Sequence, residues 1–302
     1  MRLRSAALTM AALATAVATG LPAASADAAP TRSVSFDQAA QARAIAYWTP
    51  ARMAAAVDLD VPDKGGASTR TRVAQSSPQR WTGGGLIATT GGKVFFHNPK
   101  DNGDYACSGD AVNSDNKSVV ATAGHCVVDV DGTSYTNWVF IPAYDHGNRP
   151  YGTFTATSLH WEAQRIGDSD AAWDAAFATV GQVNRRRLVD TVGGQGIGFD
   201  QTPGQSVYSF GYGGSDAEGN GEQMNWCTGT EINPGGHEGG GVWGIDCVQS
   251  GGSSGGPFLQ NFDPSTGTGM QIGNISISAG SYEYHPYYGW EAAAAYNAAQ
   301  GS

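Results

Sequence analysis

SVVATAGHC, residues 118–126, combines a run of β-branched and small residues with a histidine and a cysteine at its end. Val119 and Thr122 favour an extended strand, and Gly124 allows the chain to turn directly after it. His125 would then lie just after the end of the strand, beside a cysteine that a disulfide can anchor. The stretch therefore predicts a strand that holds a fixed histidine, as general-base chemistry requires. A surface histidine without a function is the alternative for this stretch alone.

Short apolar segments of the same kind recur beyond residue 80, separated by Gly, Asn, Asp and Pro. They predict strands, and no long amphipathic helical pattern interrupts them, so an all-β architecture is favoured. The 222 residues after Arg80 (302 − 80) suffice for one large β domain or two small barrels. The expected strands are 93–96, 118–122, 138–141, 175–180, 206–210, 241–247 and 270–277.

The N-terminal end has the pattern of an export signal. Arg2 and Arg4 precede an apolar run, and the small residues Ala-Ser-Ala at 24–26 follow it. The run is shorter than the roughly 20 residues that span a bilayer, which argues against a membrane anchor. We expect residues 1–26 to be a secretory signal peptide and the protein to be secreted into the extracellular space.

Residues 27–80 differ from the rest in their alanine-rich helical sequence and their lack of cysteine. Thr49-Pro50 suits a helix cap followed by a first-turn proline. The stretch ends near Arg80 in an exposed, linker-like sequence that a protease can cut. We therefore expect a propeptide at about 27–80. A small helical domain retained in the mature protein is the alternative.

The part after residue 80 is strongly acidic. It holds 8 of the 17 Lys and Arg residues and 22 of the 27 Asp and Glu residues, a net charge of −14 (8 − 22). Nucleic acids and anionic membranes both require a basic face, so neither is expected as a partner. Nothing in the sequence indicates oligomerisation, and we expect a monomer. The basic cluster at 185–187 is expected to be a solvated connection between two halves.

All four cysteines follow residue 80, as the close pairs Cys107 and Cys126, and Cys227 and Cys247. In a secreted chain such pairs predict disulfides. Three connectivities are possible, and we favour Cys107–Cys126 with Cys227–Cys247 because each bond then closes a short local loop. A metal site is the alternative, but the sequence lacks the C-x-x-C spacing that would support one.

Asp174 lies in the segment WDAAFA at 173–178, so an acid directly precedes an apolar strand. An acid in such a place can accept the Nδ1–H of a histidine, which selects its tautomer and stabilises the imidazolium. Asp168 and Asp170 are rivals, but they lie in polar sequence typical of a solvated turn. Asp174 is therefore the preferred partner for His125.

GGSSGGPF, residues 251–258, places two serines between two glycine pairs. If Ser254 is a nucleophile, the glycines permit a sharp turn and leave the N–H groups of Gly252 and Ser254 free to bind an oxyanion. Each such donor contributes on the order of 3 to 4 kcal/mol in the transition state. A flexible glycine–serine linker is the alternative for the octapeptide alone.

Taken together, TAGHC at 122–126, DAAF at 174–177 and GSSGGP at 252–257 resemble the chymotrypsin-like serine peptidases, in the order His, Asp, Ser. The finer resemblance is to the bacterial glutamyl-endopeptidase branch. It rests on Asp246 before the serine, on the glycine pair, and on Phe-Gly-Tyr at 210–212.

The resemblance implies two six-stranded antiparallel β-barrels, with the active site in the cleft between them. The N-terminal barrel would comprise residues 81–188 and the C-terminal barrel residues 189–302. Ser254 would attack the peptide carbonyl through an acyl-enzyme, His125 would carry the proton, and Asp174 would orient His125. The substrate would be a protein or peptide, and neither a cofactor nor a metal is expected.

Ser253 departs from the animal members of the family, which carry there an aspartate that pairs with the freed N-terminus. A neutral serine cannot form that pair, so removal of the propeptide is expected to unblock or complete the site.

Specificity in the family comes from the residues just before the serine and from the strand after it. Val248 is not the acid that a trypsin-like pocket would place there, and Ile275 and Ser276 stand where glutamyl endopeptidases use a histidine. A preference for glutamate therefore does not follow. We expect a polar pocket around Gln249 and Ser276.

Three other functions remain open from the sequence. One is a non-catalytic protein of the same fold, although no member of the triad is missing. Another is a secreted β-domain that binds protein or polysaccharide through residues such as Trp226, Trp243 and Trp290, although aromatic residues in β proteins more often pack the core. An esterase would need alternating helices that the chain lacks.

Overall fold

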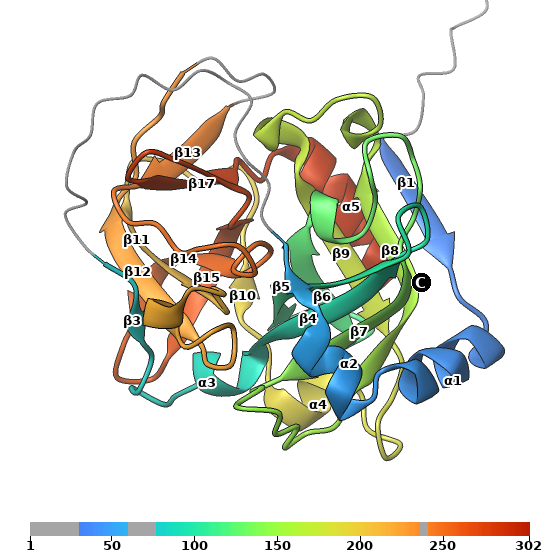
Figure 1. Cartoon of the computed structure of the whole chain (residues 1–302). Helices are drawn as coiled ribbons and strands as arrows, with labels where there is room; N and C mark the ends of the chain where they lie inside the picture. Colours follow the sequence, from blue (N-terminus) through green and yellow to red (C-terminus); the bar gives the residue numbers. More distant parts are fainter. Residues whose placement is uncertain (1–29, 60–76, 236–240) are drawn as a thin grey trace, which may run out of the picture.

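The computed structural model describes residues 30–59, 77–235 and 241–302. The expected signal peptide, residues 1–26, lies outside this part. Within the described part, no helix is long and apolar enough to cross a membrane. The chain folds into two β-rich bodies side by side, with helices on the flanks (Figure 1).

The first body is a closed six-stranded antiparallel barrel, in which each strand pairs with the next around the ring. Its core holds large side chains such as Phe96, Trp138 and Phe154. Burying an aromatic or aliphatic side chain of this kind stabilises the fold by about 1.5–3 kcal/mol. The ring runs through β4 (Gly91–Asn98), β5 (Gly103–Val112), β6 (Val119–Ala123), β9 (Ala175–Val180), β8 (Phe154–Glu162) and β7 (Thr136–Pro142).

The second body consists of two sheets. All of its strand pairs are antiparallel except β10 with β15. The larger sheet has the order β10 (Gly196–Ile197), β15 (Thr268–Asn274), β14 (Pro257–Asp263), β11 (Ser206–Gly211), β12 (Asn225–Thr230) and β3 (Gln79–Arg80). The smaller has the order β13 (Val242–Ile245), β17 (Tyr282–Pro286) and β16 (Ile277–Ala279).

The predicted fold class, all-β with two β bodies, is confirmed. Each expected strand overlaps an observed one, although 270–277 covers the end of β15 and only the first residue of β16. In the second half, the described strands form an open six-stranded sheet plus a separate three-stranded sheet.

The N-terminal segment 30–59 packs on the first body. β1 (Thr31–Ser35) pairs with β8, and β2 (Val57–Asp58) pairs in parallel with β5. Between them lie α1 (Gln38–Tyr47) and α2 (Pro50–Ala55). Thr49 caps α2, whose first residue is Pro50, because its hydroxyl accepts the N–H of Arg52 at 3.3 Å.

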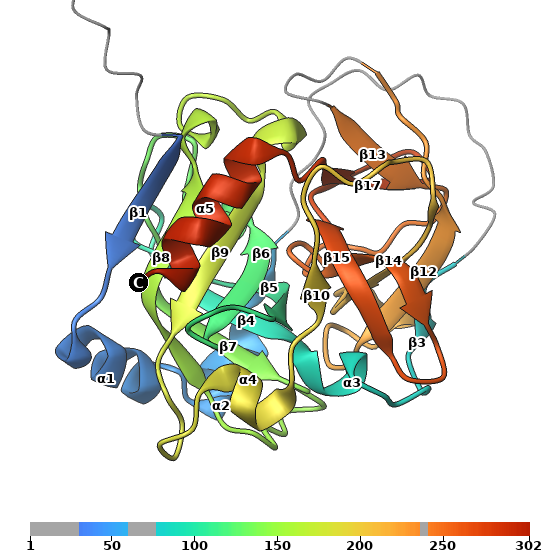
Figure 2. The same ribbon diagram turned by 180° about the vertical axis from the view of Figure 1, so that it is seen from behind.

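The C-terminal helix α5 (Trp290–Gln300) crosses from the second body back to the outside of the first barrel, as Figure 2 shows from behind. Tyr288 and Tyr296 pack there against Phe177 of β9. The last residues of the chain thus cover the first body. The other short helices are α3 (Ile87–Thr90), α4 (Leu188–Val192), η1 (Gly124–Cys126), η2 (Ala163–Arg165), η3 (Ala171–Trp173) and η4 (Asp216–Glu218).

Both disulfides have the pairing favoured from the sequence. Cys107 of β5 bonds to Cys126 in the turn after β6, with 6.3 Å between their Cα atoms. Cys227 of β12 bonds to Cys247, which follows β13, with 6.1 Å between their Cα atoms. The first bond anchors the turn that carries His125.

Candidate active site

Two neighbouring strands of the first barrel bring His125 and Asp174 together. β6 and β9 are antiparallel, and their register places Ala123 opposite Ala175. The residues just beyond that pair therefore meet at the same end of the barrel. The N–H of Gly124 donates to the carbonyl of Asp174 at 2.9 Å, which closes the contact between the two turns.

The Asp174 carboxylate holds His125 at two points. One oxygen accepts the backbone N–H of His125 at 2.8 Å, and the other lies 2.6 Å from the ring Nδ1. Both side chains are buried. Burial would raise the pKa of Asp174, but the neighbouring His125 and Arg165 hold that pKa down at about 2. Asp174 is therefore ionised at neutral pH and orients the ring with Nδ1 as its donor.

Ser276, which was expected in a specificity pocket, contacts the carboxylate that orients His125. Its hydroxyl donates to the Asp174 carboxylate at 2.6 Å. Ser276 precedes β16, and its N–H donates to the carbonyl of Tyr284 on β17, which turns the side chain toward the first body. The sequence carries no signal for this contact, because 102 residues separate the two partners.

Asp168 and Asp170, the alternatives to Asp174, form hydrogen bonds within their own turn, as their polar sequence predicted. An oxygen of Asp168 accepts the N–H of Asp170 at 2.8 Å, and an oxygen of Asp170 accepts the N–H of Ala172 at 2.9 Å. These contacts form the turn that leads into η3.

The glycines of GGSSGGPF are needed for close approaches of the backbone. Gly252 and Gly255 have φ angles of +93° and +87°, which side chains disfavour. A Cβ on Gly255 would lie 2.3 Å from the carbonyl oxygen of Ser108, and one on Gly256 would lie 1.9 Å from that of Phe210. The octapeptide is thus a tight turn between the two bodies and not a flexible linker.

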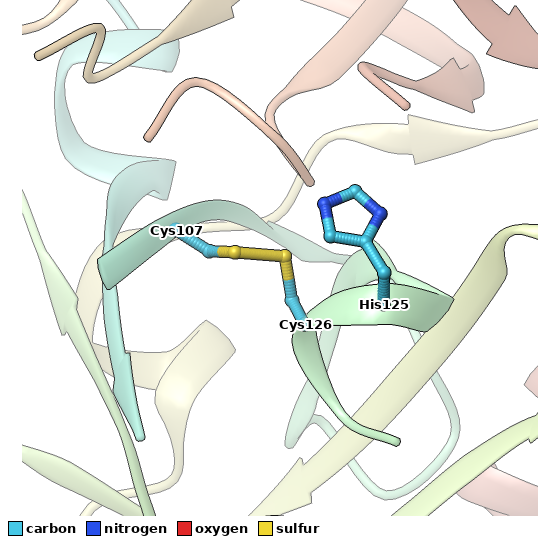
Figure 3. Close-up of side chains that lie close together, drawn as sticks. All are labelled: Cys107, His125 and Cys126. Atoms are coloured by element: carbon cyan, nitrogen blue, oxygen red, sulfur yellow. A yellow bond between two sulfur atoms is a disulfide. The ribbon is translucent and has the colours of Figure 1, made fainter. Parts of the chain in front are cut away.

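Ser254 lies in this turn, against β5 and the disulfide next to His125. Its carbonyl accepts the N–H of Ser108 at 2.7 Å and lies 3.7 Å from Sγ of Cys126. The side-chain hydrogen bonds of the described residues include none between Ser254 and His125, whose Nε2 is buried without a partner. Such bonds often tighten only when substrate binds. Figure 3 shows the ring of His125 beside the Cys107–Cys126 disulfide.

Cys107, His125 and Cys126 are the one group of described side chains spaced to hold a metal ion. Both sulfurs belong to the disulfide, so neither is a thiolate ligand.

The N–H of Gly252, one expected oxyanion donor, already has an acceptor. It donates to the carbonyl of Leu59, at the end of the N-terminal segment, at 2.8 Å. Leu59 in turn donates its N–H to the carbonyl of Ala106 at 3.0 Å, which continues the β2–β5 pairing. No described residue accepts the N–H of Ser254. Leu59, the last described residue before the gap at 60–76, therefore lies in the candidate site.

Asp58, the residue before Leu59, ties the N-terminal segment to β4 of the first barrel. Its carboxylate lies 3.3 Å from Nζ of Lys93, whose side chain is 4% exposed. Lys93 also donates to the carbonyl of Gly221 at 2.8 Å. The Asp58 side chain packs so close to Gly252 that a Cβ there would lie 2.9 Å from a carboxylate oxygen. Sequence patterns did not reveal this pair, because its partners are distant in the chain.

The remaining predicted pocket residue, Gln249, is buried behind the serine turn. Its N–H donates to Glu283 of β17 at 3.0 Å, and its side-chain amide donates to Ser209 at 3.3 Å. Glu283 was not identified from the sequence, since it stands 29 residues after Ser254 (283 − 254) in a tyrosine-rich stretch. His285 is buried as well, with its Nε2 2.7 Å from Glu231.

No family model and no curated protein matches the chain. Solved structures do match. The crystal structure of the protease Anisep from Arthrobacter nicotinovorans is 36% identical with a TM-score of 0.66, over 74% of this chain and 100% of that one. The thermostable serine protease AL20 from an extremophilic microorganism is 33% identical with a TM-score of 0.65, over 72% and 99%. A Glu endopeptidase that is 15% identical shares the fold, with a TM-score of 0.60 over 76% and 99%.

Proposed function

The chain belongs to the chymotrypsin-like serine endopeptidases, and from this premise we propose that it is a secreted zymogen whose triad is Ser254, His125 and Asp174. The substrates are peptides or proteins. One observation carries the assignment: Asp174 holds His125 through both its backbone N–H and its ring Nδ1, beside the turn that contains Ser254.

In the proposed reaction, Ser254 Oγ attacks the carbonyl carbon of the peptide bond while Nε2 of His125 takes its proton. The negative oxygen that forms accepts the N–H groups of Gly252 and Ser254. The imidazolium then gives its proton to the leaving amine, and an acyl-enzyme remains on Ser254. Water, deprotonated by His125, hydrolyses that ester and restores the serine. Asp174 stays ionised throughout, consistent with its low pKa.

We further propose that residues 27–80 form an inhibitory propeptide. The carbonyl of Leu59 occupies the N–H of Gly252, where the reaction needs a free donor. The match to Anisep covers all of that chain but only 74% of this one. The part of this chain outside the match is about as long as residues 1–80. The proposed secretion rests on the signal peptide expected at residues 1–26.

The test is labelling with a fluorophosphonate, which reacts with an activated serine. We expect label on Ser254, mapped by peptide mass, after the N-terminal segment has been removed. Ser254→Ala should lose the label, whereas Ser253→Ala, a change one residue away, should keep it. A processed and folded protein that takes no label would contradict the catalytic assignment and favour a binding domain. Label that does not increase on removal of residues 27–80 would contradict the inhibitory role alone.

A further inference from the structure

Glu283 is a buried carboxylate that the proposed mechanism does not use. It lies on β17 and has no exposed surface. One oxygen accepts the hydroxyl of Ser209 on β11, and the other accepts the N–H of Gln249 at 3.0 Å. Both donors favour an ionised carboxylate, because the ionised form only accepts hydrogen bonds.

The carboxylate lies between the two segments that flank the reactive serine. Gln249, which donates to it, stands five residues before Ser254 (254 − 249). On the other side, β16 pairs Ser278 with Glu283. β16 directly follows Ser276, which contacts Asp174.

The two segments that flank Glu283 are partly exposed to solvent. Ser250 and Gly251 before the serine, and Ser278 and Ala279 on β16, are all of intermediate exposure. Glu283 contacts the first segment through Gln249 and pairs with Ser278 of the second, so a substrate side chain inserted between the two segments would approach its carboxylate. Gly252 and Ser254, the expected oxyanion donors, directly follow the first segment, so we assign this side chain to the residue whose carbonyl they bind.

No cation balances Glu283 among the described residues. His285, two positions further along the strand, is paired with Glu231 at 2.7 Å. The nearest other charge that acts on Glu283 is Glu218, which is also negative, and burial raises the Glu283 pKa to about 7. A buried carboxylate without a counter-charge is costly, and a cation brought in from solution would offset that cost.

We propose, on the basis of the serine-peptidase function above, that Glu283 selects substrates with lysine or arginine on the N-terminal side of the cleaved bond. A long cationic side chain can reach a carboxylate that lies below the serine turn, and its charge completes the missing ion pair. The acidic part after residue 80, with its net charge of −14 (8 − 22), would also attract cationic peptides.

The same preference suits the expected end of the propeptide. Arg80 stands at the predicted boundary with its side chain exposed, in the two-residue strand β3 that pairs with β12. An enzyme that cuts after arginine could process a second copy of the chain at this residue once β3 separates from β12.

The test compares two peptide substrates that differ only at the residue before the cleaved bond, lysine in one and norleucine in the other. Norleucine has the same aliphatic chain without the ammonium group. For the processed enzyme we expect kcat/KM to be about 100-fold higher for lysine, in the range measured for close charge pairs at interfaces. Glu283→Gln should reduce this ratio at least tenfold.

Glu291→Gln is the matched control, because it removes one negative charge from α5, which packs on the first body, whereas Glu283 lies on β17 of the second. It should leave the ratio unchanged. If Glu283 only holds the serine turn in place, Glu283→Gln lowers kcat/KM for both peptides equally, and the ratio stays the same. That result would overturn the proposal.

A second measurement needs no variant. Benzamidine carries a cationic amidinium, and benzamide is its neutral analogue. We expect benzamidine to slow the labelling of Ser254 at concentrations at least tenfold lower than benzamide. Equal potency of the two compounds, or a lysine-to-norleucine ratio near one in an enzyme that labels, refutes the role of Glu283 and leaves the serine-peptidase function intact. An enzyme that neither labels nor cleaves any peptide refutes both.

Discussion

Replacing Asp58 by Asn tests whether the N-terminal segment keeps the enzyme inactive. The change preserves the size of a side chain that packs against Gly252, and removes its charge. The Asp58 carboxylate lies 3.3 Å from Lys93 only when the segment is bound. The substitution therefore weakens the bound state and leaves the released state unaffected. We therefore expect the segment to dissociate more readily from the site, which frees the N–H of Gly252.

The magnitude follows from the burial of the pair. The side chains of Lys93 and Asp58 are 4% and 24% exposed, so water screens the contact only in part. A partly buried ion pair of this kind contributes on the order of 1.5–3 kcal/mol, between the values for exposed and for fully buried pairs. At 1.4 kcal/mol per tenfold change, this corresponds to an increase of about 10- to 150-fold in the open fraction.

The assay is the rate of fluorophosphonate labelling of the unprocessed chain, which a gel separates from the shorter processed form. Arg52→Gln is the control, because the Arg52–Asp104 pair also ties the segment to the barrel but involves an arginine that is 48% exposed. Exposed pairs contribute about 0–1 kcal/mol, so this variant should label at most about fivefold faster than the wild type. If Asp58→Asn labels no faster than Arg52→Gln, the inhibitory contact at Gly252 is wrong.

Three further predictions concern buried polar groups. Asp174→Asn should lower kcat/KM by about 10⁴-fold, because an amide favours the wrong tautomer of His125, while urea unfolding shows a folded protein. Ser276→Ala removes a donor to the Asp174 carboxylate and should lower kcat/KM about 10- to 150-fold, equivalent to about 1.5–3 kcal/mol; an unchanged value would show that the contact is unimportant. Complete burial raises the pKa of Asp110 from 3.8 to about 8. The folded state then keeps a proton that the unfolded state releases, so stability is lost as the pH rises from about 4 to 8. Asp110→Asn should flatten that dependence in urea titrations at pH 5 and pH 8.

Local patterns were sufficient for features that depend on neighbours in the chain. The β-branched run at 119–122 is a strand because such residues suit an extended backbone, and Thr49-Pro50 begins a helix because a hydroxyl caps it. The strands of low apolar content were not predicted. β5 (Gly103–Val112) contains Gly109 and Asp110 in its buried half, and only the barrel around it explains why they are extended.

The candidate triad also came from sequence, because His125, Asp174 and Ser254 each stand in a short segment whose residues favour a turn beside a strand. The contacts around the triad depend on residues far apart in the chain. Packing of the two bodies brings Ser276 to Asp174 and Leu59 to the N–H of Gly252, and packing within the second body brings Glu283 to Gln249. A hydrogen bond or an ion pair acts over a few ångströms in space and leaves no periodic trace in sequence. The candidate triad and the fold class could therefore be predicted from the amino-acid sequence, whereas the contacts of Ser276, Glu283 and Leu59 around it depend on the tertiary structure.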